Sequence, residues 1–181
     1  EYVDVDDRIF PRRGIGGNIV LRGGVEGAGS DANFAQVHAR ATWYRGIGER
    51  HRLILRGEAG HTWTDALVAM PPSLRFYAGG DRSIRGYDWR EVGPRLGDYA
   101  LGAKHVFTGT AEYEHYFENG FGFAVFADSG SAFDDSPDWH TGVGVGVRWA
   151  SPVGPLRLDI ARGLDDPDSP FTLHLDIGTV F

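Results

Sequence analysis

Arg85 lies in a glycine-rich stretch, and its residue type and position indicate a specific ionic contact more clearly than those of any other residue in this chain. The stretch reads Gly79-Gly80-Asp81-Arg82-Ser83-Ile84-Arg85-Gly86-Tyr87. Its glycines let the backbone turn sharply, so that the guanidinium can be aimed in one direction. Asp128 and Glu112 are the candidate partners, because both fall at polar positions of alternating segments. In a partly dry interior, arginine forms a bidentate, charge-assisted contact with a carboxylate that lysine cannot reproduce.

We therefore expect Arg85 to latch its loop to a wall that carries Asp128, Glu112 or both. Removing one partner of a truly buried pair costs about 3–5 kcal/mol. A solvated surface arginine is the alternative. The flanking Gly80, Gly86 and Tyr87 favour the latch.

Asp128 and His140 form a second candidate pair, because both are expected on one face near the ends of adjacent segments. A carboxylate and an imidazole can perform acid–base chemistry, as in a protease or a lipid-A hydrolase. However, Ser129 alternates to the opposite face, and the sequence contains neither G-x-S-x-G nor H-E-x-x-H. We therefore favour a non-enzymatic protein with no cofactor and no metal site.

Metal binding has little further support in the sequence. The chain has no cysteine, which excludes disulfides and thiolate sites. The cluster Asp165-Asp166-Pro167-Asp168 could attract divalent cations that bridge lipopolysaccharide, but it lacks the spaced ligands of a calcium loop. A solvated acidic loop is the better interpretation. The formal charge of −7 disfavours nucleic acid as a partner.

The elements that must position these residues are strands, because apolar and polar residues alternate along eight segments. The predicted strands are Ile15–Glu26, Ala35–Trp43, Leu53–Trp63, Gly109–Phe117, Phe121–Ser129, Trp139–Trp149, Leu156–Ala161 and Phe171–Phe181. Residues 1–14 are interpreted as a turn. Residues 66–105 form a long loop that carries the Arg85 motif, and a loop of that length is usually functional.

The two faces of these strands differ in kind. One face is apolar and ends in aromatic residues at both levels, whereas the other carries charges and glycines in mid-strand. The charged positions are Arg40, Arg56, Glu58, Glu112, Arg148 and Asp159. The connections alternate between short turns and long polar loops, which is typical of an outer-membrane barrel. A soluble barrel or sandwich is the alternative, since its strands alternate too.

Specific motifs sharpen this interpretation. Gly79–Tyr87 looks like the VRGF-type motif of loop six in Omp85-superfamily barrels, with Ile84 and Tyr87 in place of the commoner Val and Phe. Phe126-Ala127-Asp128-Ser129-Gly130 resembles the F-x-D-x-G motif of strand thirteen, and Glu112 matches the inward glutamate of strand twelve. Three further segments are similar to the same superfamily: the turn Pro11–Gly14, the segment Arg148–Asp159 (as in TamA-like members) and the terminal Phe181.

The resemblance implies an all-β, antiparallel transmembrane β-barrel in the bacterial outer membrane. Such barrels have sixteen strands after periplasmic POTRA domains, so residues 1–181 would be one barrel domain that corresponds to strands nine to sixteen. A start at Glu1 without Met or signal peptide is typical of a trimmed or cut chain. Eight strands closed on themselves are the alternative.

The resemblance also implies a function. TamA- and BamA-type members insert or translocate outer-membrane proteins by strand pairing at a barrel seam, with the loop latched by the Arg–Asp pair. The seam and the targeting signal would involve Phe171, Leu175, Ile177, Gly178 and Phe181. Implied partners are outer-membrane lipid and lipopolysaccharide, client outer-membrane proteins and a TamB-like periplasm-spanning protein. A two-partner secretion pore shares the same motifs and is the further alternative.

Overall fold

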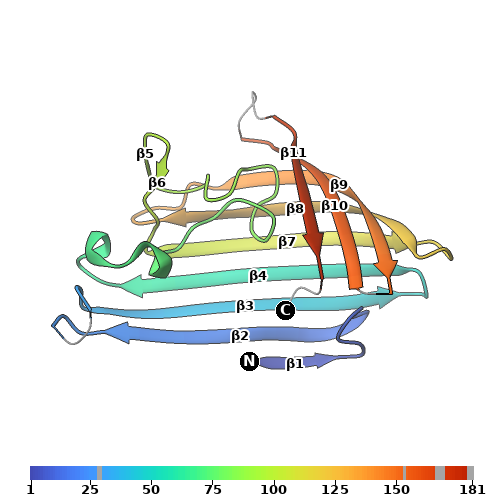
Figure 1. The fold of residues 1–181 in the computed structure, drawn as a ribbon, viewed down its shortest axis with the longest axis horizontal. Helices are drawn as coiled ribbons and strands as arrows, with labels where there is room; N and C mark the ends of the chain where they lie inside the picture. The colour runs from blue at the N-terminus through green and yellow to red at the C-terminus, as the bar shows by residue number, and fades with distance from the viewer. Residues whose placement is uncertain (28–29, 153, 166–169, 179–181) are drawn as a thin grey trace.

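The fold is one curved antiparallel sheet with a long loop on its concave side (Figure 1). The computed structural model describes residues 1–181 apart from 28–29, 153, 166–169 and 179–181. Nine strands follow one another in chain order across the sheet. They are β1 (Tyr2–Val5), β2 (Arg13–Gly24), β3 (Phe34–Ile47), β4 (His51–Trp63), β7 (His105–Tyr116), β8 (Phe121–Phe133), β9 (His140–Ser151), β10 (Gly154–Gly163) and β11 (Thr172–Ile177).

The connections alternate in length, as predicted. Short turns join β3 to β4, β7 to β8 and β9 to β10, whereas long loops lie at the other end of the strands. Residues 64–104 form the longest loop, which joins β4 to its sheet neighbour β7. This loop contains two 3-10 turns, η1 (Leu67–Ala69) and η2 (Pro72–Leu74), and a small hairpin of β5 (Arg95–Leu96) and β6 (Tyr99–Ala100). In the described residues, no helix has the length and apolarity needed to cross a membrane.

The interpretation of residues 1–14 as a turn was wrong in part, because Tyr2–Val5 forms β1. This strand pairs with β2 from Tyr2↔Gly17 to Val5↔Gly14. The Asp6 carboxylate accepts the backbone N–H groups of Arg12 and Arg13 at 2.8 and 3.0 Å, which closes the turn between the two strands. Four residues are too few for a clear period-two signal, so the sequence showed eight strands where the sheet has nine.

The described residues form an open sheet, with β1 and β11 at its edges. This arrangement matches half of a larger barrel and not a barrel closed on itself. Within the described residues β11 runs from Thr172 to Ile177, and the last three residues of the predicted strand Phe171–Phe181 lie outside the described residues. Gly178 follows in a bend with φ +112°, a backbone conformation that favours glycine, and its N–H still donates to the Pro155 carbonyl of β10. Phe181 lies outside the described residues.

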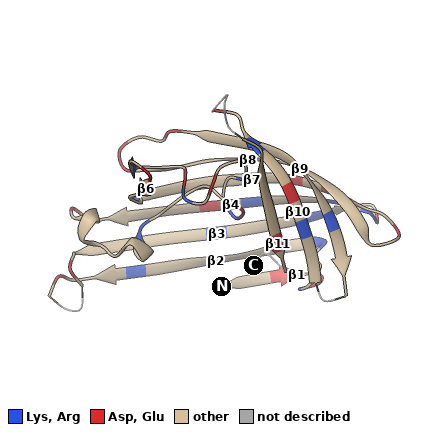
Figure 2. Cartoon of the chain, turned by 45° about the horizontal axis from the view of Figure 1, so that its top comes forward, with Lys and Arg blue, Asp and Glu red and all other residues tan. Residues whose placement is uncertain are grey.

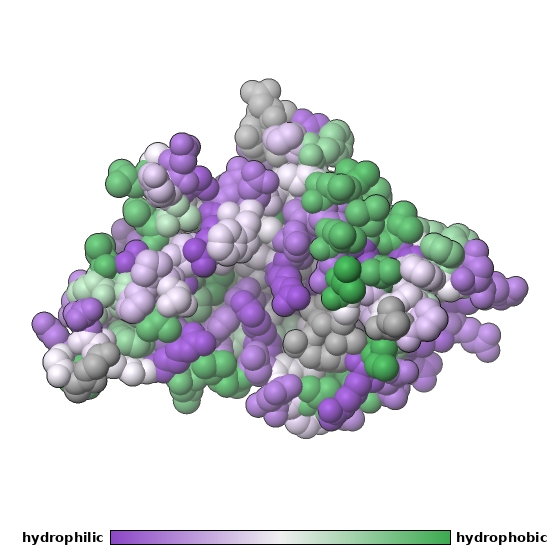
Figure 3. Space-filling view, in the orientation of Figure 1, coloured by the Kyte–Doolittle hydropathy of each residue, from purple (hydrophilic) through white to green (hydrophobic). Residues whose placement is uncertain are grey.

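The two faces of the sheet are oriented as the alternation predicted for a membrane barrel. On the outer face, Val145 and Leu175 are 58% and 61% exposed, whereas Arg148 on the inner face is 0% exposed. Figure 2 shows acidic and basic residues on the same strands, for instance on β10. Figure 3 shows hydrophobic residues over the outer side of β9 to β11, next to hydrophilic residues in the hollow of the sheet. A soluble sandwich would show the reverse arrangement.

The apolar core lies between the loop and the inner face of the sheet. Its buried residues are Phe76, Ala78, Ile84, Tyr87, Val92 and Ala103 from the loop, with Val106 from β7 and Ala132 from β8. The loop thus supplies most of the apolar contacts and anchors itself inside the curve of the sheet. Ile84, which is 0% exposed, anchors the motif directly beside Arg85.

Candidate functional site: an ion network beneath the loop motif

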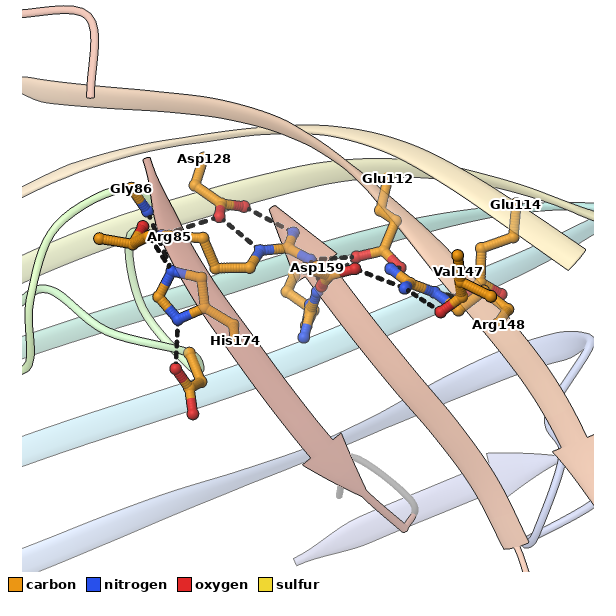
Figure 4. Close-up of polar contacts among 12 residues, drawn as sticks. Arg85, Gly86, Glu112, Glu114, Asp128, Val147, Arg148, Asp159 and His174 are labelled. Atoms are coloured by element: carbon orange, nitrogen blue, oxygen red, sulfur yellow. Dashed lines mark hydrogen bonds and ion pairs between the residues drawn. The ribbon is translucent and has the colours of Figure 1, made fainter. Parts of the chain in front are cut away.

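Arg85 reaches from the loop to three strands of the sheet (Figure 4). Its Nε and Nη2 donate to the two carboxylate oxygens of Asp128 at 2.7 and 3.0 Å, and its backbone N–H donates to Asp128 Oδ2 at 3.0 Å. Its Nη1 donates to Glu112 Oε2 at 2.9 Å and to Asp159 Oδ2 at 2.8 Å. The structure therefore brings Arg85 together with both expected carboxylates and with Asp159 from β10, which was not expected as a partner.

The surroundings of Arg85 stabilise its charged form. The guanidinium carbon lies 3.3 Å from the centroid of the Phe126 ring, which is a cation–π contact. Burial acts to lower the pKa of Arg85, but the hydrogen bonds that it donates to Asp128 and the nearby charges of Glu112, Asp128 and Asp159 outweigh it and raise the pKa above its ordinary value. Arg85 is 3% exposed, so these contacts are shielded from water.

The network continues from Glu112 toward the short-turn end of the strands. Arg148 donates to Glu112 Oε1 at 2.8 Å and to Glu114 Oε1 at 2.9 Å, and it also contacts Asp159. Arg56 donates to Glu112 Oε2 at 2.8 Å, and Arg52 donates to Glu114 Oε2 at 2.7 Å. Four arginines thus contact four carboxylates, and Arg157, which is buried beside them, adds a fifth positive charge.

A row of glycines on β9 makes room for these groups. A Cβ atom on Gly142 would lie 1.8 Å from the backbone oxygen of Arg85, and one on Gly144 would lie 2.4 Å from the Phe126 ring. A Cβ atom on Gly146 would lie 1.8 Å from Asp159 Oδ1. The sequence showed this row, but the alternation alone did not indicate that the loop would pack against it.

The glycines of the motif are needed for backbone conformation. Gly79, Gly80 and Gly86 have φ values of +100°, +98° and +96°, which L-residues rarely adopt. At Gly86 a Cβ atom would also lie 2.5 Å from the backbone carbon of Arg162. The loop therefore approaches β10 at a distance that only glycine permits.

Tyr87 ties the motif to the long-loop end of the sheet. Its hydroxyl donates to Asp165 Oδ2 at 3.0 Å and to the Thr141 carbonyl at 3.3 Å. Burial, together with the negative charge of Asp165, raises the pKa of Tyr87 to about 12. The hydroxyl therefore stays protonated and keeps donating at neutral pH.

His174 connects the loop to the edge strand β11, a contact that sequence reasoning missed. Its Nε2 accepts the backbone N–H of Gly86 at 3.2 Å, and its Nδ1 pairs with the Asp81 carboxylate. Arg82 lies 3.8 Å from Asp176 of the same strand. Two features of the sequence indicate this contact: the inward position of His174 in the alternation, and Asp81 within the motif.

The other expected residues lie elsewhere. Gly130 faces Thr108 of β7, where a Cβ atom would lie 2.5 Å from the Phe107 oxygen. Phe171, Leu175 and Ile177 are exposed on or beside the edge strand. These residues do not take part in the ion network.

The acid–base pair of Asp128 and His140 is not assembled. Arg85 engages both oxygens of Asp128, whereas His140 contacts the Asp138 carbonyl at 2.9 Å and packs edge-on against the Tyr87 ring at 5.3 Å. Among the described residues, no group of three or more His, Cys, Asp or Glu could hold a metal ion. Asp165 is described, but the rest of the acidic cluster lies outside the described residues.

Comparisons with known proteins agree with this architecture. The family profile described as "Omp85 superfamily domain" matches residues 2–181. The outer membrane protein assembly factor BamA of Nitratidesulfovibrio vulgaris is 32% identical over 149 residues, which are 76% of this chain and 19% of that protein. BamA of Neorickettsia risticii is 26% identical over 177 residues, which are 88% of this chain and 23% of that protein.

A solved structure shares the fold. The crystal structure of BamA from Haemophilus ducreyi lacking POTRA domains 1–3 aligns with a TM-score of 0.76 at 18% identity, and it covers 98% of this chain and 39% of that one. The chain thus spans about a fifth of the length of the curated relatives described above.

Proposed function

The chain belongs to the Omp85 superfamily and forms part of a transmembrane β-barrel of the bacterial outer membrane, and from this premise we propose that the protein carrying it assembles other outer-membrane proteins without covalent chemistry. Its BamA relatives are named outer membrane protein assembly factors. The observation that carries the proposal is the edge strand β11, which pairs within the described residues only with β10.

The edge of β11 offers main-chain groups to an incoming strand. Gly178 N–H donates to the Pro155 carbonyl, so the facing residues Leu156 and Ile177 form a non-hydrogen-bonded pair. By alternation, the N–H and C=O groups of Leu173, Leu175 and Ile177 point away from β10, toward the open edge. A client strand can add there by β-augmentation, in which main-chain hydrogen bonds supply the affinity.

In this proposal the loop sets the position of that edge. Arg85 joins the loop to β7, β8 and β10, and His174 joins it to β11. The latch would keep the sheet curved and hold β11 ready for pairing. The bend at Gly178 would loosen the end of the strand, where pairing with a client could begin.

A TamA-like role is the finer form of the same proposal. The resemblance of Arg148–Asp159 to TamA-like members supports it, whereas the BamA relatives support general assembly of client proteins. The partners would be client outer-membrane proteins, the lipid and lipopolysaccharide around the apolar face and, for the TamA-like role, a TamB-like periplasm-spanning protein. Copurification of such a partner with the full-length protein would separate the two roles.

Cysteine crosslinking tests the use of the edge. This chain has no cysteine, so single cysteines can be placed cleanly within it. We expect Leu175→Cys in the full-length protein to crosslink to a cysteine in the terminal strand of a client arrested during insertion. Val145→Cys is the matched control, because it is similarly exposed on the same outer face but lies within the sheet on β9. Equal crosslinking from both positions would contradict the proposal.

A proline substitution tests the edge hydrogen bonds themselves. Leu175→Pro removes one N–H that points to the open edge and leaves the ladder with β10 intact, which edge strands tolerate. We expect slower insertion of a client barrel into vesicles with little change in barrel melting. Leu158→Pro in β10 is the control, because its N–H faces β9 and its loss should destabilise the sheet. Normal insertion by the Leu175→Pro protein would argue against pairing at β11.

A further inference from the structure

Two histidine pairs face each other across β4 and β7, at opposite ends of these strands. His61 lies opposite His105, and His51 lies opposite His115. The Thr62 N–H donates to the Lys104 carbonyl and the Tyr116 N–H donates to the Arg50 carbonyl, so both pairs occupy non-hydrogen-bonded positions of the ladder. Side chains approach most closely at such positions, with Cα atoms about 4.5 Å apart.

The first pair has the geometry of a bidentate metal site. The Nδ1 atoms of His61 and His105 lie 2.8 Å apart. A metal held by two imidazoles at about 2.0–2.1 Å separates their nitrogens by about 2.8–3.4 Å for bond angles between 90° and 109°. A small opening of the pair would therefore admit a cation between the rings. One ring now donates to the other, and it would move its proton from Nδ1 to Nε2 when both nitrogens bind the metal.

The position of this pair gives the site a role. His61 lies near the end of β4 and His105 begins β7, so the pair closes the neck of the loop of residues 64–104. Trp63 packs edge-on against His61 at 4.1 Å, and Phe133 stacks on His105 at 4.9 Å, which fixes the orientation of both rings. A cross-link at the neck of a long loop holds the two ends of the loop together, so closing the loop costs less chain entropy.

We propose that His61 and His105 bind a late first-row divalent cation, such as Cu²⁺ or Zn²⁺, as a clip at the neck of the loop. Imidazole favours these cations, whereas Mg²⁺ and Ca²⁺ prefer oxygen ligands. Among the described residues no third protein ligand joins the pair, so water or a lipid phosphate completes the coordination. The site differs from the ion network, which lies on the inner face of the sheet.

The second pair provides an internal comparison. His51 and His115 have their Nδ1 atoms 3.1 Å apart, but His51 Nδ1 also contacts the Tyr113 hydroxyl. This hydroxyl competes for the nitrogen that a metal would need. We therefore expect His61 and His105, at the neck of the loop, to bind the cation more tightly than His51 and His115.

Copper titration of the full-length protein in detergent, followed by electron paramagnetic resonance, tests the site. We expect His61→Gln and His105→Gln each to remove the tightest nitrogen-ligated Cu²⁺ from the titration. His51→Gln should leave that Cu²⁺ in place, as should His38→Gln, which alters a histidine paired with Glu58 on the inner face. Zn²⁺ should displace the Cu²⁺, whereas Mg²⁺ and Ca²⁺ should not.

A second measurement is independent of the spectrum. Zn²⁺ should slow protease cleavage within residues 64–104 of the native protein and should not slow it in His61→Gln. Heat-modifiable gel mobility confirms that each variant is folded. Unchanged copper binding in both neck variants, or loss of the tightest site in His51→Gln instead, would overturn the proposal.

Discussion

Replacing Arg85 with methionine tests whether the ion network holds the loop. Methionine keeps much of the side-chain length and removes the charge. Arg85 makes five hydrogen bonds in the network, and the four from its guanidinium would be lost, while the one from its backbone N–H could remain. Asp128 and Glu112, each 1% exposed, would keep their negative charge with one counter-ion fewer.

The magnitude follows from this burial. Removing one partner of a buried ion pair costs about 3–5 kcal/mol, because the other charge stays desolvated. At about 1.4 kcal/mol per tenfold change, this lowers the folding equilibrium constant by roughly two to four powers of ten. Urea unfolding of the full-length barrel in lipid vesicles, followed by tryptophan fluorescence and heat-modifiable gel mobility, measures the effect.

Two further variants separate charge from geometry. Arg85→Lys keeps the charge but loses the bidentate contact with Asp128, so its stability should lie between those of the native and methionine proteins. Asp128→Asn combined with Arg85→Met removes one stranded charge and should recover part of the loss. If Arg85→Met changes the unfolding free energy by less than about 0.5 kcal/mol, as an ordinary surface substitution does, water screens the network and Arg85 does not hold the loop.

Three other substitutions test the surroundings of the motif. Gly142→Ala should destabilise the barrel by about 1–3 kcal/mol through overpacking against the loop backbone. Gly57→Ala is the control and should not destabilise the barrel, because its Cβ atom would meet nothing within 4 Å. Equal unfolding midpoints of the two variants would contradict the prediction. His174→Phe should speed hydrogen exchange in β11 (Thr172–Ile177), because the contacts to Asp81 and Gly86 are lost; unchanged exchange would show that the loop does not hold β11. The pKa of Tyr87 is raised to about 12 in the folded protein, so the Tyr87 hydroxyl ionises at a lower pH in the unfolded chain than in the folded one. The free energy of unfolding should therefore fall as the pH rises from about 10 to 12. Tyr87→Phe should weaken this pH dependence.

The sequence predicted the features that depend on alternation. Period-two patterning identified eight of the nine strands described in the large sheet, assigned the apolar residues to the outside and placed Asp128 and Glu112 inside. These properties are local, since the direction of each side chain follows from its position along its own strand. The glycines around Arg85 likewise signal a sharp turn without any knowledge of the rest of the fold.

The features that were missed depend on the register between strands and on the depth of the loop. Asp159 joins the network because β10 lies beside β9, and the glycines of β9 leave room for the Asp159 carboxylate. His174 meets Gly86 only because the loop crosses the sheet as far as β11. No pattern within one segment contains this information, although the charges and the glycine row were visible in the sequence.

The ion network has a further consequence for the choice of register. A slip of one residue would turn Arg148 toward lipid, at a cost of about 2–4 kcal/mol near the middle of the membrane. A slip of two residues would keep every face correct but would shift the side chains by about 6.6 Å along the strand, beyond hydrogen-bonding distance. Gly142, Gly144 and Gly146 must stay where no Cβ atom fits, and Arg148 adds hydrogen bonds to β7 and an ion pair to β10, so both features favour one register of β9. A buried network that adds little net stability can in this way select one of the registers that alternation alone leaves equivalent, and that register places β11 where the loop can hold it.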